Sequence, residues 1–168
     1  MDKPLLNIDE AQYMDLAAMS RNMGQELPAE RFGGGMASLG RALGARKLGY
    51  NVTVIAPGKR SFPFHAHRGN EEMFFIIEGR GELRFGDKTY PLRAGDVIAC
   101  PPGGPEVAHQ IVNTSDAELK FLGVSTALTP DVCHYPDSDK FAVLDGFGPG
   151  GFKYVGREES GVGYWDGE

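Results

Sequence analysis

Apolar and polar residues alternate with a period of two through the middle of the chain. Short alternating runs bounded by glycine, proline, asparagine or aspartate are typical of β-strands with one buried face. The pattern predicts eight strands, at residues 50–55, 62–67, 72–78, 82–85, 89–92, 97–100, 107–113 and 119–125. Turn signals such as Pro57-Gly58 and Gly86-Asp87 separate neighbouring runs. Eight short strands at this spacing predict a sandwich or barrel of the all-β class.

The run at 72–78 departs from simple alternation because it is apolar on both faces. Phe74 and Ile76 share a face with Glu72 and are expected to point into the barrel. The opposite face is formed by Met73, Phe75 and Ile77. An N-terminal arm, a C-terminal tail or a second subunit must cover this face. We expect a second subunit, and therefore a homodimer, because exposed apolar patches usually mark interfaces.

The chain divides into three zones within a single domain. These are an N-terminal arm at 1–45, a barrel at 46–125 and a C-terminal tail at 126–168. In the arm we expect a short helix over 8–19, capped by Asn7 or Asp9. The tail is rich in glycine, proline, aspartate and aromatic residues and shows no periodicity. It is therefore expected to pack irregularly on the barrel.

Composition and charge argue against several classes of protein. The chain has 168 residues, which suits one domain with a sizeable core. Its net charge of −6 and isoelectric point near 5.2 argue against nucleic acid as a partner, because nucleic-acid sites need basic patches. No apolar run approaches the roughly 18 residues of a membrane span, and the N-terminus lacks the form of a signal peptide. With two cysteines and no disulfide framework, we expect a cytoplasmic protein.

Three of the four histidines and one glutamate have the spacing of a metal site. His65 and His67 lie two residues apart, so on a strand they share one face, with Cα atoms about 6.5 Å apart. A turn then returns the chain, and Glu72 opens the next strand, while His109 comes from a strand further along. Three imidazoles with one carboxylate suit Fe, Mn, Ni, Co or Zn. The alternative is a metal-free barrel that keeps these residues as a polar pocket.

The residues around the histidines resemble the two sequence motifs of the cupin superfamily. In the first, G-x5-H-x-H-x3,4-E-x6-G, Gly58 and Gly79 supply the glycines, with six residues rather than five after Gly58. The second, G-x5-P-x-G-x2-H-x3-N, is similar to residues 95–113, with five residues in place of two before His109. The resemblance implies a double-stranded β-helix (jelly roll). It also implies one divalent transition metal bound by His65, His67, Glu72 and His109.

The tail carries a second resemblance. Its segments 135–140 (YPDSDK) and 164–168 (YWDGE) are similar to those of a group of small bacterial single-domain cupins, sometimes described as sugar-phosphate-isomerase-like. This resemblance implies the fold and the metal site but not the substrate. The leading hypothesis is a metal-dependent enzyme that acts on a small oxygenated metabolite, as a dioxygenase or a sugar-type isomerase. Because cupins with this ligand set also include storage proteins, a non-catalytic module that binds or senses a small ligand is the alternative.

Several residues near the motifs have two interpretations. Glu71 could replace Glu72 as a metal ligand, but alternation along the strand predicts that Glu71 faces away from the site. Arg60 and Ser61 precede the histidine pair and could contact an anionic substrate or simply shape a turn. Cys100 could line the pocket or be a small buried residue.

No second catalytic device is visible in the sequence. Cys133 and His134 are adjacent, so their side chains diverge and do not form a nucleophile–base pair, and we expect structural roles for both. The glycine-rich stretch 146–151 contains Pro149 and lacks a strand–helix frame, which argues against a dinucleotide-binding loop. The catalytic residues other than the metal ligands are therefore left open.

Overall fold

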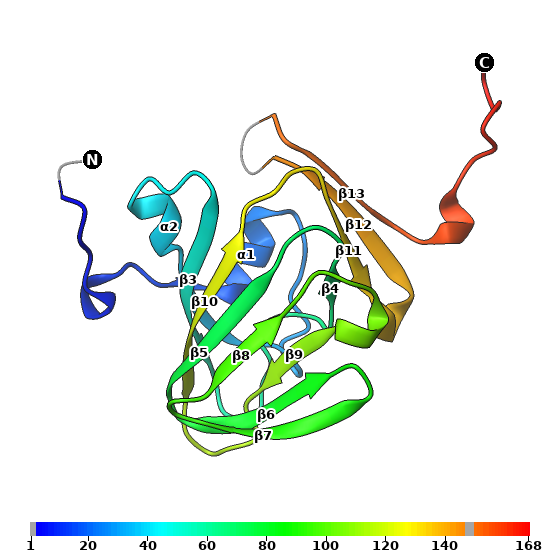
Figure 1. Cartoon of the computed structure of the whole chain (residues 1–168). Coiled ribbons are helices and arrows are strands. Elements are labelled where there is room, and N and C mark those ends of the chain that lie inside the picture. Colours follow the sequence, from blue (N-terminus) through cyan, green and yellow to red (C-terminus); the bar gives the residue numbers. More distant parts are fainter. Residues whose placement is uncertain (1–2, 147–149) are drawn as a thin grey trace.

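The computed structural model describes residues 3–146 and 150–168, and β-strands dominate it (Figure 1). The strands of the barrel are β3 (Leu48–Ile55), β4 (Ala66–His67), β5 (Glu72–Glu78), β6 (Arg80–Phe85), β7 (Lys88–Arg93), β8 (Val97–Cys100), β9 (His109–Val112) and β10 (Leu119–Thr126). Each corresponds to one of the eight predicted runs, and the bounds of β5 and β8 are those predicted. The fold is a jelly roll, as the sequence indicated.

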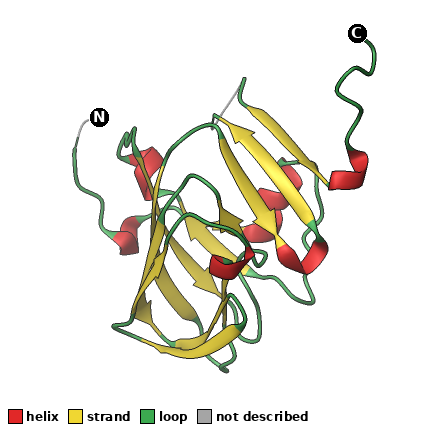
Figure 2. Ribbon diagram, turned by 45° about the vertical axis from the view of Figure 1, so that its right-hand side comes forward, coloured by secondary structure: helices red, strands yellow, loops and turns green. Residues whose placement is uncertain are grey.

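The core lies between two sheets that face each other (Figure 2). One is six-stranded, with the order β1-β2-β3-β10-β5-β8, in which β1 (Met14–Asp15) and β2 (Gly34–Ala37) come from the N-terminal arm. The other is three-stranded, with the order β7-β6-β9. The strands of both sheets send apolar side chains into one cluster. Its fully buried members include Ile55, Ile76, Leu119 and Phe121. The buried positions on β5 confirm the predicted register, because Phe74 and Ile76 face this cluster.

Two strands are shorter than the sequence pattern predicts. The expected strand at 62–67 keeps only Ala66 and His67, because Pro63 has no backbone N–H to donate to a neighbouring strand. The expected strand at 107–113 begins only at His109, after a 3₁₀ helix, η2 (Pro105–Val107). His67 and His109 lie in the short regular segments that remain, and His65 lies just before β4, where it forms an isolated bridge with His109.

The N-terminal arm is more strand-like than predicted. The expected helix over 8–19 is interrupted: η1 (Ile8–Glu10) is a single 3₁₀ turn capped by Asn7, and α1 (Leu16–Asn22) begins only after Asp15 caps it. Between and after them lie two short strands and a second helix, β1 (Met14–Asp15), β2 (Gly34–Ala37) and α2 (Leu39–Ala42). Because β2 pairs with β3, the arm extends the six-stranded sheet. Among the described residues, no helix is long and apolar enough to cross a membrane.

The outer face of β5 is covered only in part. Ile77 packs in a cluster with residues of the N-terminal arm that include Leu6 and Ile8. Phe75, by contrast, is 38% exposed, and its partner across the strands, Val97, is also exposed. The arm therefore covers one end of the face that the sequence assigned to a second subunit.

The C-terminal zone contains regular strands, although its sequence predicts irregular packing. It forms the strands β11 (Asp131–Tyr135), β12 (Lys140–Asp145) and β13 (Phe152–Gly156), and the 3₁₀ helices η3 (Pro136–Ser138) and η4 (Glu158–Ser160). These strands continue into the barrel, in a four-stranded sheet with the order β13-β12-β11-β4. Gly148 and Pro149 of the glycine-rich stretch lie outside the described residues.

Candidate metal centre

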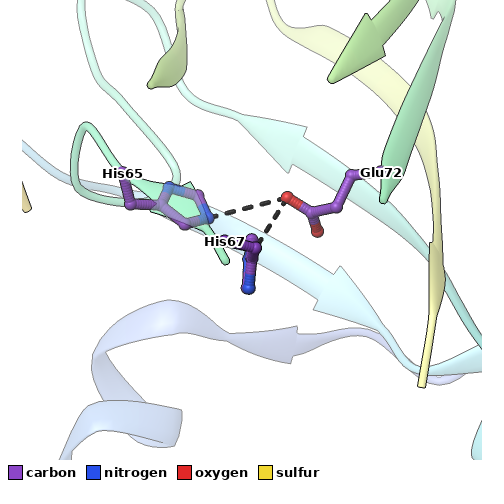
Figure 3. Close-up of side chains that lie close together, drawn as sticks. All are labelled: His65, His67 and Glu72. Atoms are coloured by element: carbon purple, nitrogen blue, oxygen red, sulfur yellow. Dashed lines mark ion pairs between the residues drawn. The ribbon is translucent and has the colours of Figure 1, made fainter. Parts of the chain in front are cut away.

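The fold brings the four predicted ligands to one point. His65 pairs with His109 through two backbone hydrogen bonds of 3.2 and 2.8 Å, which places the two side chains next to each other. Glu72 Oε2 lies 3.7 Å from His65 Nε2 and 3.4 Å from His67 Nε2 (Figure 3). The same oxygen lies 3.0 Å from His109 Nε2. The longer loop before His109 does not remove this histidine from the site.

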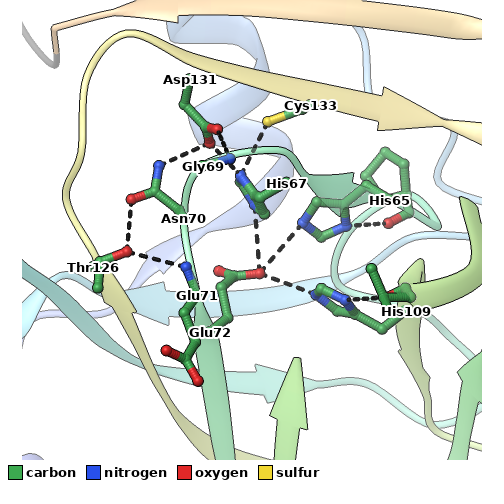
Figure 4. A network of polar contacts seen from close by, with 12 residues as sticks. His65, His67, Gly69, Asn70, Glu71, Glu72, His109, Thr126, Asp131 and Cys133 are labelled. Carbon is green, nitrogen blue, oxygen red and sulfur yellow. Dashed lines mark hydrogen bonds and ion pairs between the residues drawn. The ribbon is translucent and has the colours of Figure 1, made fainter. Parts of the chain in front are cut away.

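The opposite nitrogen of each imidazole is held by an acceptor (Figure 4). His65 Nδ1 lies 2.9 Å from the carbonyl oxygen of Pro63, and His109 Nδ1 lies 3.3 Å from that of Val107. A carbonyl oxygen only accepts, so Nδ1 carries the proton in both rings. His67 Nδ1 is 2.6 Å from Asp131 Oδ2 and donates to it in the same way. All three rings therefore direct Nε2, the nitrogen available for a ligand, toward Glu72.

The donor set fits a divalent transition metal. Two ligands bound at right angles with bonds of about 2.1 Å lie about 3 Å apart, and the Nε2–Oε2 separations here are 3.0–3.7 Å. Neutral imidazoles and a carboxylate are the ligands that such ions share. The four side chains are also largely buried, so the site is shielded from solvent.

Without an ion, protons balance the charge of the carboxylate. Burial raises the pKa of Glu72, but hydrogen bonds from His109 and His67 outweigh burial and hold the pKa well below its usual range. Burial lowers the pKa of His67, but its contacts with Cys133 and Glu72 outweigh burial and raise the pKa to about 11. Burial, assisted by His109, lowers the pKa of His65 to about 4. In the metal-free site, the carboxylate of Glu72 is thus held by hydrogen bonds from His109 and His67.

Asp131 is a site residue that the sequence did not single out. Its side chain is 1% exposed, and besides His67 it accepts hydrogen bonds from Asn70 Nδ2 at 2.8 Å and Gly69 N at 2.9 Å. Asn70 Oδ1 in turn accepts from the hydroxyl of Thr126 at 2.8 Å (Figure 4). This network fixes the ring of His67 and ties the turn after it to β11. The contact spans 64 residues, so no local pattern could have indicated it.

Glu71, Cys133 and His134 differ in how close they lie to the site. Glu71 is exposed and only its backbone is held, by the hydroxyl of Thr126. Cys133 lies against the site, with Sγ 3.2 Å from His67 Nδ1, whereas His134 pairs with Ala66 and its Nδ1 is buried without a partner in the described chain.

The other thiol belongs to Cys100, which pairs with Glu72 across β8 and β5, whereas the residues before the histidine pair lie away from the four ligands. Cys100 belongs to the apolar core, and burial raises the pKa of its thiol to about 12. Arg60 and Ser61 line a cavity between the N-terminal arm and the barrel, and the four candidate ligands are not among its lining residues. Tyr135 lines the same cavity, and its ring also stacks on His65, with the centroids 6.2 Å apart.

Sequence comparison relates the middle of the chain to a known family. Residues 51–125 match the model of the cupin domain family, and this segment contains all four residues of the site. The similarity covers 75 of the 168 residues of the chain. Among curated proteins, the chain is 36% identical over 70 residues to an oxalate-binding protein of Thermotoga maritima, which covers 42% of this chain and 54% of that protein. The chain spans about half the length of the curated relatives it matches.

Two solved structures resemble nearly the whole chain. A putative sugar phosphate isomerase from Acidithiobacillus ferrooxidans has a TM-score of 0.76 and 25% identity, over 96% of each chain. A sugar phosphate isomerase of the cupin superfamily from Silicibacter pomeroyi has a TM-score of 0.74 and 27% identity, over 94% of each chain. The similarity to these proteins includes the N-terminal arm and the C-terminal strands as well as the cupin domain.

Proposed function

We propose that the protein is a divalent-metal-dependent enzyme that acts on a small oxygenated metabolite, with a sugar-type isomerisation as the leading reaction. The observation that carries this proposal is that three Nε2 atoms converge on one oxygen of Glu72 while all three Nδ1 atoms are held by acceptors. His65, His67, Glu72 and His109 would hold the ion, which is Fe, Mn, Ni, Co or Zn. A bound divalent ion supplies Lewis acidity to the oxygen atoms of a substrate.

The other residues around the site would orient the ligands and control protons. Asp131 keeps His67 in the tautomer that offers Nε2. Burial raises the pKa of Tyr135 to about 12, so its phenol keeps its proton at neutral pH and can act as a donor but not as a base. The ring of Phe74 lies 5.6 Å from that of His109 and forms an apolar wall that limits the access of water.

The two full-length structural neighbours described as sugar phosphate isomerases support isomerisation over oxygenation. Protein purified without chelators and analysed for metal should be incubated in D₂O with a panel of sugars and sugar phosphates, and followed by proton NMR. We expect metal-dependent exchange of the hydrogen on the carbon next to the substrate carbonyl, with no oxygen consumed. The His67→Ala variant is the control and should show no exchange. Oxygen consumption coupled to loss of substrate would instead identify an oxygenase.

Non-catalytic binding is the second candidate, because an oxalate-binding protein is among the relatives. Under this proposal the metal would hold a small carboxylate ligand without turning it over. Calorimetric titration of the metal-loaded protein with oxalate and with the same sugar panel separates the two candidates. Tight binding of a ligand that shows neither exchange nor oxidation would favour the binding module.

We further propose that the protein is a cytoplasmic homodimer. Its two cysteines are free and buried, which suits a reducing compartment. The outer face of β5 offers one surface for a partner, although the N-terminal arm already covers Ile77. A second set of exposed apolar side chains lies at the C-terminal end of the chain.

A further inference from the structure

The C-terminal end of the described chain exposes a set of large apolar side chains. Tyr164 is 86% exposed and Trp165 is 78% exposed, and their rings contact each other edge to face, with centroids 4.8 Å apart. On β13, Phe152, Tyr154 and Val155 are also exposed. In both views the chain runs away from the sheets after η4 (Figures 1 and 2). Exposed aromatic residues gathered in one segment mark an interface, because water solvates them poorly.

The same segment is acidic. Residues 157–168 contain four acidic residues and one arginine. Two of the acids, Asp166 and Glu168, follow the aromatic pair directly. A surface that receives this tail must therefore combine an apolar hollow with positive charge.

The cavity between the N-terminal arm and the barrel has an apolar interior. Its volume is about 410 Å³, within the range of sites that enclose an organic side chain or ligand. Leu16 and Met19 of α1 form one wall, and Phe62 and Phe64 before β4 form the other. One large aromatic side chain and part of a second would fit in this volume.

Positive charge surrounds the cavity although the whole chain carries a net charge of −6. Arg31, Arg60 and Lys140 line it. Of its two acidic lining residues, Asp137 pairs with Arg84 through hydrogen bonds of 2.8 and 2.9 Å and lies close enough to Arg60 and Arg31 to interact with their charges, and Glu26 is exposed. Arg60 and Lys140 make no ion pair with another described residue.

We propose that the C-terminal tail of one copy of the chain binds in this cavity of a second copy. Trp165 occupies the apolar interior, and the acidic residues after it face Arg60 and Lys140. Residues 161–168 reach about 26 Å when extended, which is enough to cross to a neighbouring molecule. In a twofold dimer the exchange occurs twice, so each copy both gives a tail and receives one.

The areas suit a dimer that dissociates on dilution. Two exchanged tails would bury roughly 300–500 Å² of tryptophan surface and part of the tyrosine surface. With a comparable area from the two cavities, the total lies at or below roughly 1,200 Å², the low end of specific protein–protein interfaces. The charge complementarity adds selectivity for this tail over other apolar segments.

The test uses the full chain, in which Trp165 is the only tryptophan. Its fluorescence emission and its quenching by acrylamide are measured over a dilution series, alongside sedimentation velocity. We expect the emission to move to shorter wavelength and the quenching to weaken as the dimer forms, with the same midpoint in both measurements. Emission typical of exposed tryptophan in the dimer would overturn the proposal. Emission of buried tryptophan in the monomer would also overturn it, because the tail would then occupy its own cavity.

Three variants locate the contact, each checked by circular dichroism for a folded barrel. Trp165→Ala should weaken dimerisation at least about tenfold, as for a central aromatic contact. Arg60→Glu should weaken it as well, whereas Arg93→Glu, the same charge change at an exposed position on β7, should leave it unchanged. If Phe75→Asp dissociates the dimer and Trp165→Ala does not, the interface is the outer face of β5 and the proposal is wrong.

Discussion

Replacing Asp131 tests whether the metal centre depends on a residue that does not touch the ion. Its carboxylate receives hydrogen bonds from His67, Asn70 and Gly69 at 2.6, 2.8 and 2.9 Å, and its side chain is almost completely buried. Asp131→Ala removes all three acceptor contacts and leaves His67 free to turn. Loss of such an orienting carboxylate lowers metal affinity about 10–100-fold, which corresponds to about 1.4–2.8 kcal/mol.

The same substitution should also lower the free energy of unfolding. Breaking a buried charged network by removing one partner costs about 3–5 kcal/mol. Asp131→Asn should lower both the metal affinity and the free energy of unfolding by less than Asp131→Ala. Its amide oxygen can still accept a hydrogen bond from His67, whereas its amide nitrogen would face Gly69 N and cannot accept one. The graded series Asp, Asn, Ala therefore separates the loss of charge from the loss of the contact.

Metal affinity is measured by competition with a chromophoric chelator, and stability by chemical denaturation of the metal-free protein. Asp137→Ala is the matched control, because Asp137 is an exposed aspartate that pairs with Arg84 away from the site. It should leave metal affinity unchanged. If folded Asp131→Ala binds metal within twofold of the wild type, His67 does not need the carboxylate and the reasoning fails.

Three further predictions follow from the geometry. Glu72→Gln should lower metal occupancy at least about tenfold, because a neutral amide is a weaker ligand than a carboxylate, while the exposed Glu71→Gln should retain full occupancy by elemental analysis. The pKa of His67 is raised from 6.5 to about 11, so a metal must displace its proton, and metal affinity should rise about tenfold per pH unit above pH 7. Calorimetry in two buffers of different ionisation enthalpy should detect the released proton. A metal affinity that does not change with pH would contradict this prediction. Gly79→Ala should lower the free energy of unfolding by about 1–3 kcal/mol, because φ is +86° and a Cβ would meet a backbone carbonyl, whereas Gly163→Ala has open space and should change little in urea denaturation.

The arrangement of the barrel could be predicted because period-two alternation carries both strand position and strand face. The pattern at 72–78 correctly separates the buried Phe74 and Ile76 from the exposed Glu71 and Phe75. With that register fixed, Glu72 points into the barrel, where the histidine pair also lies. Spacing and alternation therefore place Glu72 beside the histidine pair, whereas His109 joins the predicted ligands only through the resemblance to the cupin motifs.

The features that could not be predicted depend on contacts between distant segments. Asp131 reaches His67 only because β11 pairs with β4, and nothing near residue 131 indicates this pairing. In the C-terminal zone, β13 could not be predicted because it is exposed along almost its whole length and shows no apolar–polar alternation. The helix expected over 8–19 is interrupted where β1 pairs with β2, a tertiary contact that overrides local helix propensity.

The outer strands of two sheets differ in how they resist pairing with other molecules. β7, at the edge of the three-stranded sheet, has Pro91 in its interior and a basic residue at each end, and these features block the addition of a further strand. β13, at the edge of the four-stranded sheet, has only Lys153 among Phe152, Tyr154 and Val155. An uncovered edge of this composition is a template for aggregation. Variants that leave the C-terminal segment without its partner should therefore lose solubility at this strand first, before the barrel itself unfolds.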